Sequence, residues 1–311
     1  MKIFFAALYA DKTYIWEKHK PDKVLLSYAY PRETDKTLKY LKTRNINEEV
    51  EVIIDSGAFS CWNKGEQVDI KRYRDYILKI KDSYKFKSLN FVNLDVIPGK
   101  QGDIVTEDMS NKSMYAGWEN YLWFKNQNIE TIHVYHQGES EEFLLNTIIQ
   151  SCKYIGVSPS NDAHTSQKKM WCERIFNLLP ADIKSHGFAV TSVDLMTSFP
   201  WYSVDSASWC RKSAFGNILS DAGELVFSTK GRRSYLQDNK TLKQIGMEAL
   251  KKEILEYGIL LDSNKTLEDN IKYNLKLRNE INYCFLKKME LRLNAIEGKD
   301  DKYNSRQMSL F

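Results

Sequence analysis

Eight short apolar runs, rich in β-branched and aromatic residues, recur along the first two thirds of the chain, and polar or turn-forming residues follow each of them. They span residues 3–8, 24–28, 50–54, 89–94, 131–135, 154–157, 187–190 and 201–204. The runs are continuously apolar, which is typical of parallel strands covered on both faces. Helical periodicity marks intervening segments such as 68–84, 141–152 and 168–179. Eight strands alternating with helices predict an α/β fold, a (β/α)8 TIM barrel.

A doubly wound open sheet shows the same alternation of strands and helices. When such a sheet binds a dinucleotide, it carries a GxGxxG turn after one strand, and no predicted strand here is followed by that motif. We therefore favour the barrel. In barrels of this kind the reactive groups lie at the carboxyl ends of the strands.

The chain divides into three parts by composition. Residues 1–215 contain the eight runs and are predicted to form a TIM-barrel catalytic domain. Residues 216–297 hold long, charged, helix-periodic segments at 242–257 and 267–296, which we interpret as the last barrel helix and a helical C-terminal extension. Residues 298–311 have the composition of a flexible tail.

Bulk composition constrains the class of protein. Of the 311 residues, 42% are hydrophobic and 28% charged, and no run of 18 apolar residues or signal-peptide pattern occurs, so a soluble globular protein is expected. The net charge of +4 neither establishes nor excludes nucleic-acid binding, because a local basic face can exist within a small total. The five cysteines have no CxxC spacing, which argues against a disulfide framework or zinc cluster and fits a reducing cytoplasm.

Polar side chains follow nearly every predicted strand. Asp55 and Asp205 each end an apolar run and precede small residues, in Asp55-Ser-Gly and Asp205-Ser-Ala-Ser. One such aspartate is also typical of a helix cap. Two of them at one edge of a parallel sheet, within a ring of polar strand ends, favour a two-carboxylate enzyme site. The other members of this ring are Asp95, His136, Gln137, Ser158, Asn161, Thr191 and Ser192.

Taken in order, these strand ends resemble the motifs of the tRNA-guanine transglycosylase superfamily. Asp55-Ser-Gly-Ala-Phe59 is similar to the family's Asp-Ser-Gly-Gly-aromatic motif, and Asn93-Leu-Asp95 to its base-reading aspartate. The remaining matches to family motifs are Val134-Tyr-His-Gln137-Gly138, Tyr154-Ile-Gly-Val-Ser158, His186-Gly-Phe-Ala-Val190 and Tyr202-Ser-Val-Asp205-Ser206, the last resembling the Met-Phe-Asp-Cys that holds the nucleophile. The resemblance covers residues 50–210, roughly.

The resemblance implies a base exchange at a guanosine nucleotide. Asp205 would attack C1′ of the sugar, expel guanine and form a covalent glycosyl-aspartate. An incoming 7-deazaguanine base would then displace the aspartate with retention at C1′, as in retaining glycosyl transfer. Asp55 would be the general acid and base that handles the protons of the leaving and entering rings.

The same resemblance implies a set of base-binding residues, namely Ser56, Phe59, Asp95, Gln137, Gly138 and Phe188. Asp95 would accept hydrogen bonds from the exocyclic amine and ring N–H of the base. Gln137 and the backbone of Gly138 would donate to its carbonyl oxygen. Phe59 and Phe188 would stack on its two faces. The target nucleotide would have to leave its base stack to reach such a pocket.

Departures from the tRNA enzymes point to a DNA substrate. Those enzymes carry a zinc site of three cysteines and a histidine, a spacing absent from this chain, so we predict no metal and no cofactor. The family's Pro-Thr-Arg after the nucleophile is replaced by Ala207-Ser-Trp-Cys-Arg211-Lys212, and Arg211 and Lys212 are expected to contact the nucleic-acid backbone. The chain is also shorter than the tRNA enzymes. These features resemble the 7-deazaguanine DNA transglycosylases of phages and bacterial modification islands.

A compact basic cluster follows the predicted barrel, in Lys230-Gly-Arg-Arg233. It is interpreted either as a solvated loop or as a phosphate contact, because guanidinium groups match the geometry of phosphate oxygens. The residues expected to bind phosphate in this cluster are Lys230, Arg232 and Arg233.

The last five residues, Gln307-Met-Ser-Leu-Phe311, resemble the bacterial sliding-clamp-binding peptide. Leu310 and Phe311 would enter apolar pockets of the clamp while Gln307 fixes the register. The alternative is an apolar chain end that packs on the protein itself. A clamp tether suits an enzyme that acts on DNA better than one that acts on tRNA.

We therefore expect a cytoplasmic transglycosylase, from a bacterium or a phage-infected host, that exchanges guanine in DNA for a 7-deazaguanine base resembling preQ0. One alternative is the same exchange on tRNA. Another is a nucleoside or nucleotide glycoside hydrolase, in which water replaces the incoming base. A third, outside the enzymes, is a clamp-associated DNA-binding protein with a degenerate barrel, and the presence of both Asp55 and Asp205 argues against it.

Overall fold

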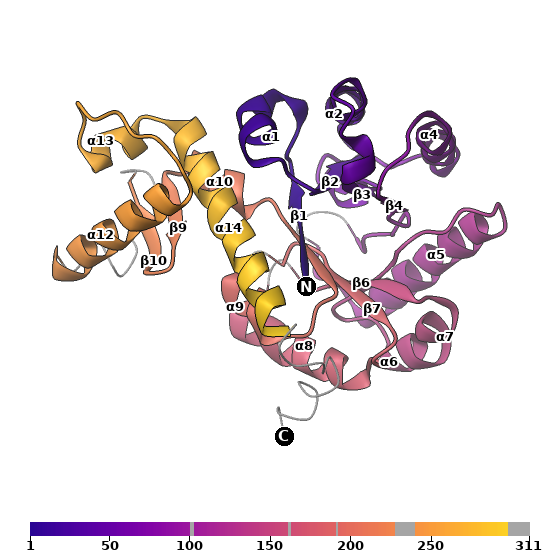
Figure 1. Ribbon diagram of the computed structural model, residues 1–311. Coiled ribbons are helices and arrows are strands. Elements are labelled where there is room, and N and C mark those ends of the chain that lie inside the picture. The colour runs from indigo at the N-terminus through magenta and orange to yellow at the C-terminus, as the bar shows by residue number, and fades with distance from the viewer. Residues whose placement is uncertain (100–102, 161–162, 191, 228–239, 298–311) are drawn as a thin grey trace. The chain divides into compact units, whose positions relative to one another are not determined.

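The computed structural model describes residues 1–99, 103–160, 163–190, 192–227 and 240–297 (Figure 1). The described residues form two compact units, one ending at Ser206 and the other beginning at Ala207. This division falls before residue 215, where the composition changes. No helix within these described ranges is long and apolar enough to cross a membrane.

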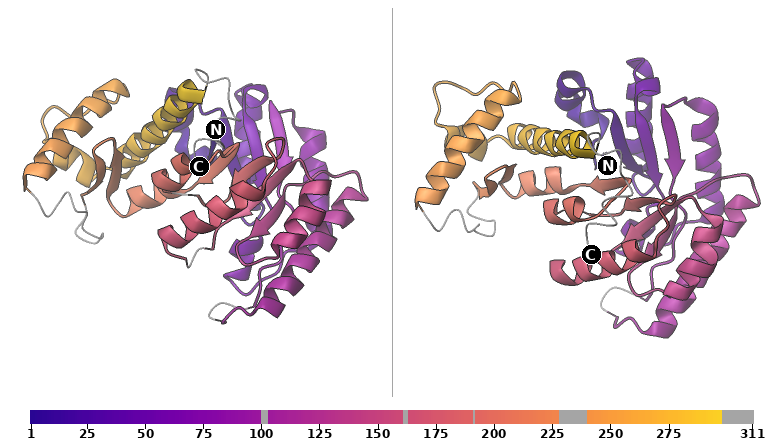
Figure 2. Two further views of the ribbon diagram at one scale, coloured as in Figure 1. Left: turned by 90° about the horizontal axis from the view of Figure 1, so that it is seen from below. Right: turned by 60° about the horizontal axis from the view of Figure 1, so that its bottom comes forward.

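The first unit is built on a curled sheet of eight parallel strands (Figure 2). The strands are β1 (Lys2–Ala6), β2 (Lys23–Ser27), β3 (Glu51–Asp55), β4 (Ser88–Phe91), β5 (His133–His136), β6 (Tyr154–Ser158), β7 (Lys184–Gly187) and β8 (Ser203–Ser206). Their order in the sheet is β4-β3-β2-β1-β8-β7-β6-β5. Each of the eight apolar runs overlaps one of these strands, although β7 lies largely before its run.

Among the described residues, one isolated backbone bridge lies between the two edge strands, β4 and β5. Val92 and Ile132 form an isolated parallel bridge, in which the Ile132 amide donates to the Phe91 carbonyl at 2.7 Å and the Asn93 amide donates to the Ile132 carbonyl at 2.9 Å. No continuous ladder joins β4 to β5 among the described residues, so the sheet is not closed. The structure therefore shows an α/β unit with a curled, all-parallel, TIM-like sheet, which is a coarser arrangement than the closed barrel that was expected.

Helices follow most strands and surround the sheet (Figure 1). They are η1 (Ala10–Lys12), α1 (Thr13–His19), α2 (Pro31–Thr43), η2 (Asn47–Glu49), α3 (Ala58–Trp62), α4 (Ile70–Ser83), α5 (Glu107–Lys125), α6 (Glu141–Phe143), the π-helical η3 (Leu144–Ile148), α7 (Ile149–Ser151), α8 (Thr165–Leu178) and α9 (Val193–Ser198). In α4 the Asp69 side chain caps the first turn, and Tyr73, Ile77 and Ile80 are buried on one face, as its periodicity predicts.

The core of the first unit fixes the strands from both sides. Val52, Ile53 and Ile54 of β3 are fully buried, and the Tyr73 hydroxyl of α4 donates to the Ile54 carbonyl at 3.2 Å and to the Val92 carbonyl at 2.9 Å. Because buried hydroxyls are costly without such partners, this contact holds α4 in one position on β3 and β4. The carboxyl ends of the strands are thereby held on a rigid frame.

The second unit contains α10 (Ser208–Ala214), α12 (Lys240–Glu256), α13 (Leu267–Lys272), α14 (Leu275–Glu297) and an antiparallel hairpin of β9 (Asn217–Ser220) and β10 (Gly223–Val226). The hairpin was not predicted, because only helices were expected beyond residue 215. Asn282 of α14, which is fully buried, holds this unit together. The side-chain oxygen of Asn282 accepts from the Leu219 backbone amide at 2.7 Å, and its side-chain NH₂ group donates to the backbone carbonyls of Trp209 and Asn217.

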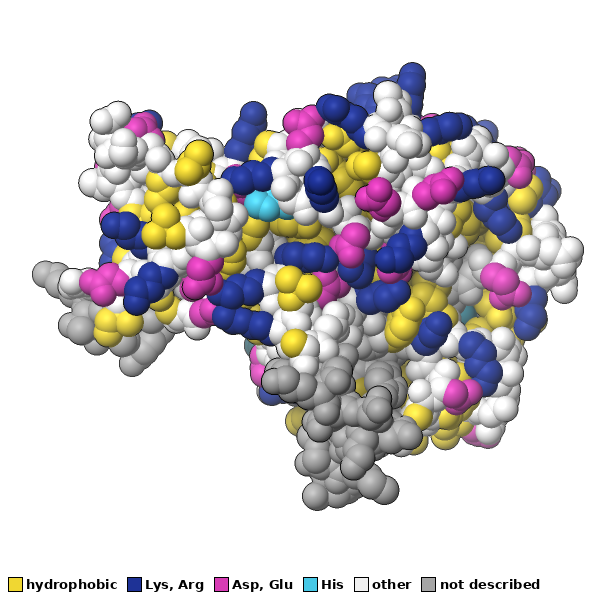
Figure 3. Space-filling model, in the orientation of Figure 1, with side chains coloured by type: hydrophobic (Ala, Val, Ile, Leu, Met, Phe, Trp, Pro, Cys, Tyr) yellow, Lys and Arg dark blue, Asp and Glu magenta, His cyan; other side chains and the backbone are white. Residues whose placement is uncertain are grey.

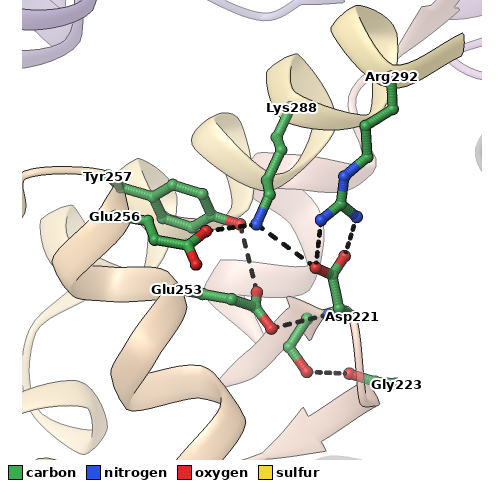
Figure 4. A network of polar contacts seen from close by, with 8 residues as sticks. Asp221, Gly223, Glu253, Glu256, Tyr257, Lys288 and Arg292 are labelled. Carbon is green, nitrogen blue, oxygen red and sulfur yellow. Dashed lines mark hydrogen bonds and ion pairs between the residues drawn. The ribbon is translucent and has the colours of Figure 1, made fainter.

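The turn of the hairpin is tied to two helices by a polar network (Figure 4). Arg292 of α14 makes two contacts with the Asp221 carboxylate, at 2.7 and 2.8 Å. Glu253 of α12 accepts from the Asp221 amide at 2.9 Å and from the Tyr257 hydroxyl at 3.2 Å. The hydrogen bonds from Arg292 lower the pKa of Asp221, whereas burial raises the pKa of Glu253. The Arg292–Asp221 ion pair therefore holds the hairpin to α14, and the backbone hydrogen bond to Glu253 holds it to α12.

Candidate active site

Three aspartates lie at the carboxyl edge of the parallel sheet. Asp55 is the last residue of β3, Asp95 follows β4, and Asp205 lies in β8. Their carboxylates are near enough to interact, because the charges of Asp95 and Asp205 both raise the pKa of Asp55. Asp205 lies 110 residues after Asp95 and 150 residues after Asp55 in the chain. The fold brings all three into one electrostatic cluster, as their places at the strand ends predict.

Asp55 is held by a tight turn. Its Oδ2 accepts from the Ser27 hydroxyl at 2.9 Å and from the Gly57 amide at 3.0 Å. Gly57 has φ +78°, and a Cβ there would lie 2.6 Å from the Ala29 nitrogen, so only glycine suits this position. Burial and the charge of Asp95 raise the pKa of Asp55 to about 7, although both hydrogen bonds lower it. A carboxyl group with this pKa can both donate and accept a proton near neutral pH.

Asp95 is shared between a serine and a histidine. Its Oδ1 accepts from the Ser56 hydroxyl at 3.4 Å, and its Oδ2 lies 3.1 Å from His136 Nε2. We describe the contact between His136 Nε2 and Asp95 as an ion pair, because the angles at Nε2 do not meet those of a hydrogen bond. Burial lowers the pKa of His136, but Asp95 and the charge of Glu139 outweigh it and raise that pKa above its ordinary value.

Glu139 joins this cluster and was not predicted from the sequence. Its Oε2 accepts from the His136 backbone amide at 3.0 Å, and burial raises the pKa of its carboxyl to about 7. It follows β5 by three residues, inside the Gln137-Gly138 turn, so its place at a strand end was the only signal that could have identified it.

Asp205 is buried, with 8% of its surface exposed. Its Oδ1 accepts from the Ala189 amide at 2.9 Å and lies 3.5 Å from His186 Nε2. Ala189 has φ +51°, a left-handed conformation that is uncommon for a residue with a side chain. The strained turn after β7 thus points a backbone N–H at the carboxylate, an arrangement that is frequent at functional sites.

Behind Asp205 lies a short chain of buried polar groups. His186 Nδ1 is 2.7 Å from Ser203 Oγ, which is 2.6 Å from the Tyr154 hydroxyl. His186 and Ser203 are fully buried. Neither Ser203 nor Tyr154 was predicted as a site residue, because both lie at the amino ends of their strands, whereas candidates were expected at the carboxyl ends.

The two aromatic residues expected to stack on the base lie beyond two different strands. Phe59 of α3 follows β3, is 46% exposed and stacks on Trp62 with ring centroids 5.8 Å apart. Phe188 follows β7 and packs on His186 with centroids 4.5 Å apart. Its ring covers Gly156, where a Cβ would lie 2.4 Å from it, so glycine at this point of β6 makes room for Phe188. The sandwich of a base between the two rings stays a prediction.

The remaining base-binding candidates lie after β3 and β5. Ser56 is fully buried and turned toward Asp95. The Gln137 side-chain oxygen accepts from the Ser160 amide at 3.0 Å, which leaves the NH₂ group of Gln137 as the donor that a base carbonyl oxygen requires. Gly138 is exposed, with φ +104°. Ser192, in contrast, caps α9 by accepting from the Leu195 amide, which is a structural role.

The predicted nucleic-acid contacts are only partly described. Arg211 and Lys212 lie in α10 of the second unit, where Arg211 is exposed and Lys212 forms an ion pair with Glu224. Lys and Arg side chains are spread over the face drawn in Figure 3, with Asp and Glu among them. The candidates that lie outside the described residues are Asn161, Thr191, Lys230, Arg232, Arg233, Gln307, Leu310 and Phe311.

Within the residues that the structure describes, no group of three or more His, Cys, Asp or Glu side chains is arranged to hold a metal ion. No protein-family model matches this chain, and no curated protein is detectably similar to it. What the cluster of carboxylates does must therefore be argued from its own geometry and chemistry.

Proposed function

We propose that this protein is a DNA-guanine transglycosylase, built on a (β/α)8 barrel, that exchanges guanine for a 7-deazaguanine base through a covalent glycosyl-aspartate. The observation that carries the proposal is the cluster of Asp55, Asp95 and Asp205 at one edge of a parallel sheet, in which burial and then the neighbouring charges raise the pKa of Asp55 to about 7. One carboxyl group suited to proton transfer beside another suited to nucleophilic attack is what retaining base exchange requires.

In the first half-reaction, a carboxylate oxygen of Asp205 attacks C1′ of the nucleotide while the bond from C1′ to the guanine N9 breaks. Guanine leaves with that electron pair and takes a proton from Asp55, which becomes ionised. In the second half-reaction, ionised Asp55 accepts the N9 proton of the incoming base, N9 attacks C1′, and the Asp205 carboxylate leaves. Asp55 thus begins and ends the cycle protonated, consistent with a pKa of about 7.

Base recognition falls to the groups around Asp95. Its carboxylate accepts from the exocyclic amine and ring N–H of the base, and the Gln137 amide and Gly138 N–H donate to the base carbonyl. Phe59, with nearly half of its surface exposed, offers a ring face for stacking, and Phe188 is the second candidate ring. His136, paired with Asp95, helps to hold that carboxylate in place.

The partners follow from the substrate. Arg211, Lys212 and the basic cluster at 230–233 contact the DNA backbone, and the C-terminal Gln307-Met-Ser-Leu-Phe311 binds a bacterial sliding clamp. The reaction needs no cofactor. All five cysteines lie among the described residues and none forms a disulfide, which fits the reducing cytoplasm where we place the protein.

Base exchange is measured directly by mass spectrometry. The full-length protein is incubated with guanine-containing DNA or with tRNA, together with a 7-deazaguanine base. Incorporation into DNA by the wild type, and its loss in Asp205→Asn, is the expected result. Incorporation into tRNA alone would transfer the proposal to the tRNA reaction, and release of guanine without incorporation would replace it with hydrolysis. If the DNA neither incorporates the 7-deazaguanine base nor loses guanine, the proposed transglycosylase activity is refuted.

A further inference from the structure

We propose that Tyr154, Ser203 and His186 form a buried hydrogen-bond relay that fixes the proton of His186 on Nε2 and directs this N–H to Oδ1 of Asp205. His186 is then a positioning residue for the nucleophile. The part of this inference that concerns catalysis rests on the proposed function, whereas the protonation pattern of the relay does not.

Strand register places the members of the relay on one face of the sheet. Paired residues of parallel strands point to the same side, and His186 of β7 pairs with both Gly156 of β6 and Ser203 of β8. Tyr154 and Asp205 lie two residues from Gly156 and Ser203 respectively, so they share that face. Gly156 has no side chain, which leaves space for the ring of Phe188, and this ring packs on His186.

The distances favour one sequence of contacts, although the Tyr154 hydroxyl also lies 3.5 Å from His186 Nδ1, farther than Ser203 Oγ does. The Tyr154 hydroxyl is 2.6 Å from Ser203 Oγ, Ser203 Oγ is 2.7 Å from His186 Nδ1, and His186 Nε2 is 3.5 Å from Asp205 Oδ1. His186 Nε2 is buried and has no hydrogen-bond partner among the described residues. The Asp205 carboxylate is therefore the acceptor that we assign to it. Catalytic hydrogen bonds are often this long before substrate binds and shorten afterwards.

The chemistry of the groups sets the direction of the protons. If His186 Nδ1 carried the only ring proton, the bare Nε2 lone pair would face the Asp205 carboxylate, which is repulsive. With the proton on Nε2 instead, Nδ1 accepts from the Ser203 hydroxyl, and the Ser203 oxygen accepts from the Tyr154 hydroxyl. Every group then has a partner, which burial demands.

The relay selects which oxygen of Asp205 attacks. Ala189 N–H and His186 Nε2–H both reach Oδ1, so Oδ2 is the oxygen that forms the bond to C1′. In the glycosyl ester Oδ1 becomes the carbonyl oxygen, which still accepts from the same two donors. The relay therefore transfers no proton and keeps the carboxylate oriented in both half-reactions, which lowers the barrier by pre-organisation.

The protonation pattern is tested in the unliganded, full-length protein by ¹⁵N NMR of the histidine rings. We expect His186 to show the neutral pattern with the proton on Nε2, and Ser203→Ala to disturb this pattern. Assignment comes from His186→Gln, which removes the signals. A proton on Nδ1, or a pattern unchanged in Ser203→Ala, would overturn the relay whether or not the protein exchanges bases.

The catalytic part is tested by the rate of glycosyl-enzyme formation in a single turnover on DNA. Ser203→Ala, Tyr154→Phe and His186→Gln are each expected to slow this step by about 10- to 100-fold, the worth of a hydrogen bond to a charged group, with little change in KM. Tyr202→Phe, a neighbouring tyrosine outside the relay, is the matched control and is expected to keep the wild-type rate.

The two possible failures are distinguishable. A wild type that forms no adduct would refute the proposed function, while the NMR pattern still decides the relay. A wild type that forms the adduct, with relay variants as fast as Tyr202→Phe, would refute the positioning role alone. Circular dichroism of each variant confirms that a slow rate does not come from unfolding.

Discussion

Replacement of Asp55 by Asn is expected to stabilise the protein at alkaline pH while it abolishes base exchange. In the folded protein the pKa of Asp55 is raised from 3.8 to about 7, by burial first and by the Asp95 charge second. The folded state therefore holds this proton more tightly than the unfolded chain does. The resulting stabilisation is fully present below the unfolded pKa and is lost as the pH rises through about 7.

The size of the effect follows from that difference. The two pKa values differ by about 3 (about 7 minus 3.8), and each pKa unit corresponds to about 1.4 kcal/mol, so ionising Asp55 costs the folded state at most about 4 kcal/mol well above pH 7. Asn resembles the protonated carboxyl in shape and cannot ionise. The free energy of unfolding of Asp55→Asn should thus exceed that of the wild type by an amount that grows with pH.

Urea denaturation at about pH 5 and about pH 8.5 measures this difference. Tryptophan fluorescence is a suitable signal, because six of the seven tryptophans precede residue 206 and so report on the first unit. Asp75→Asn, at a surface carboxylate that pairs with Arg74, is the matched control and should behave like the wild type. If Asp55→Asn is equally or less stable than the wild type at the higher pH, the environment inferred for Asp55 is wrong.

Three further predictions concern single contacts. Asn282→Ala should lower the free energy of unfolding by about 3–5 kcal/mol in urea denaturation, because it removes the side-chain partners of two buried backbone groups, the Asn217 carbonyl and the Leu219 amide. A loss under about 1 kcal/mol would contradict this. Gly156→Ala should displace Phe188 and raise the KM for the base by roughly tenfold, whereas an unchanged KM would remove Phe188 from the base site. Asp221→Asn should lower the free energy of unfolding by about 1 kcal/mol at neutral pH. It should have no effect below the native pKa of Asp221, which Arg292 lowers, because the carboxyl is then uncharged. Urea denaturation at both pH values measures this, and an equal loss at acidic pH would contradict it.

The apolar runs predicted the strands because their interiors are buried on both faces, as at Val52, Ile53 and Ile54. They misplaced β7, whose residues are Lys184-Ser-His-Gly187. Ser185 and His186 are fully or almost fully buried although they are polar, so hydrophobicity does not mark them. A strand that contributes polar groups to a site is difficult to recognise from apolar periodicity for this physical reason.

The β9–β10 hairpin was overlooked for a different reason. Its strands have four residues each, and the connecting Asp221-Ala222 does not contain the Asn-Gly or Asp-Gly pair that marks a tight turn. What fixes the turn is Asp221, through Arg292 and Glu253, which come from helices far along the chain. Contacts of this kind are tertiary and leave no local pattern in the sequence.

At the candidate site too, residues that make only tertiary contacts have no local pattern in the sequence. A search for carboxylates at strand ends identifies Asp55, Asp95 and Asp205, because an aspartate after an apolar run is a local signal. Ser27, which donates to Asp55, and Ser203, which contacts His186 beside Asp205, are small hydroxyl residues without any such signal.

Register supplies what local pattern cannot. Once His186 is known to pair with Ser203, the alternation of side chains along β8 places Ser203 and Asp205 on the same face, and the alternation along β7 adds His186 and excludes its neighbours. A shift of one residue in the β7–β8 pairing would turn His186 away from Asp205. The chemistry proposed for Asp205 thus depends on the pairing of two short strands. The glycine at position 156 belongs to the same arrangement, because it leaves room for Phe188, which packs on His186.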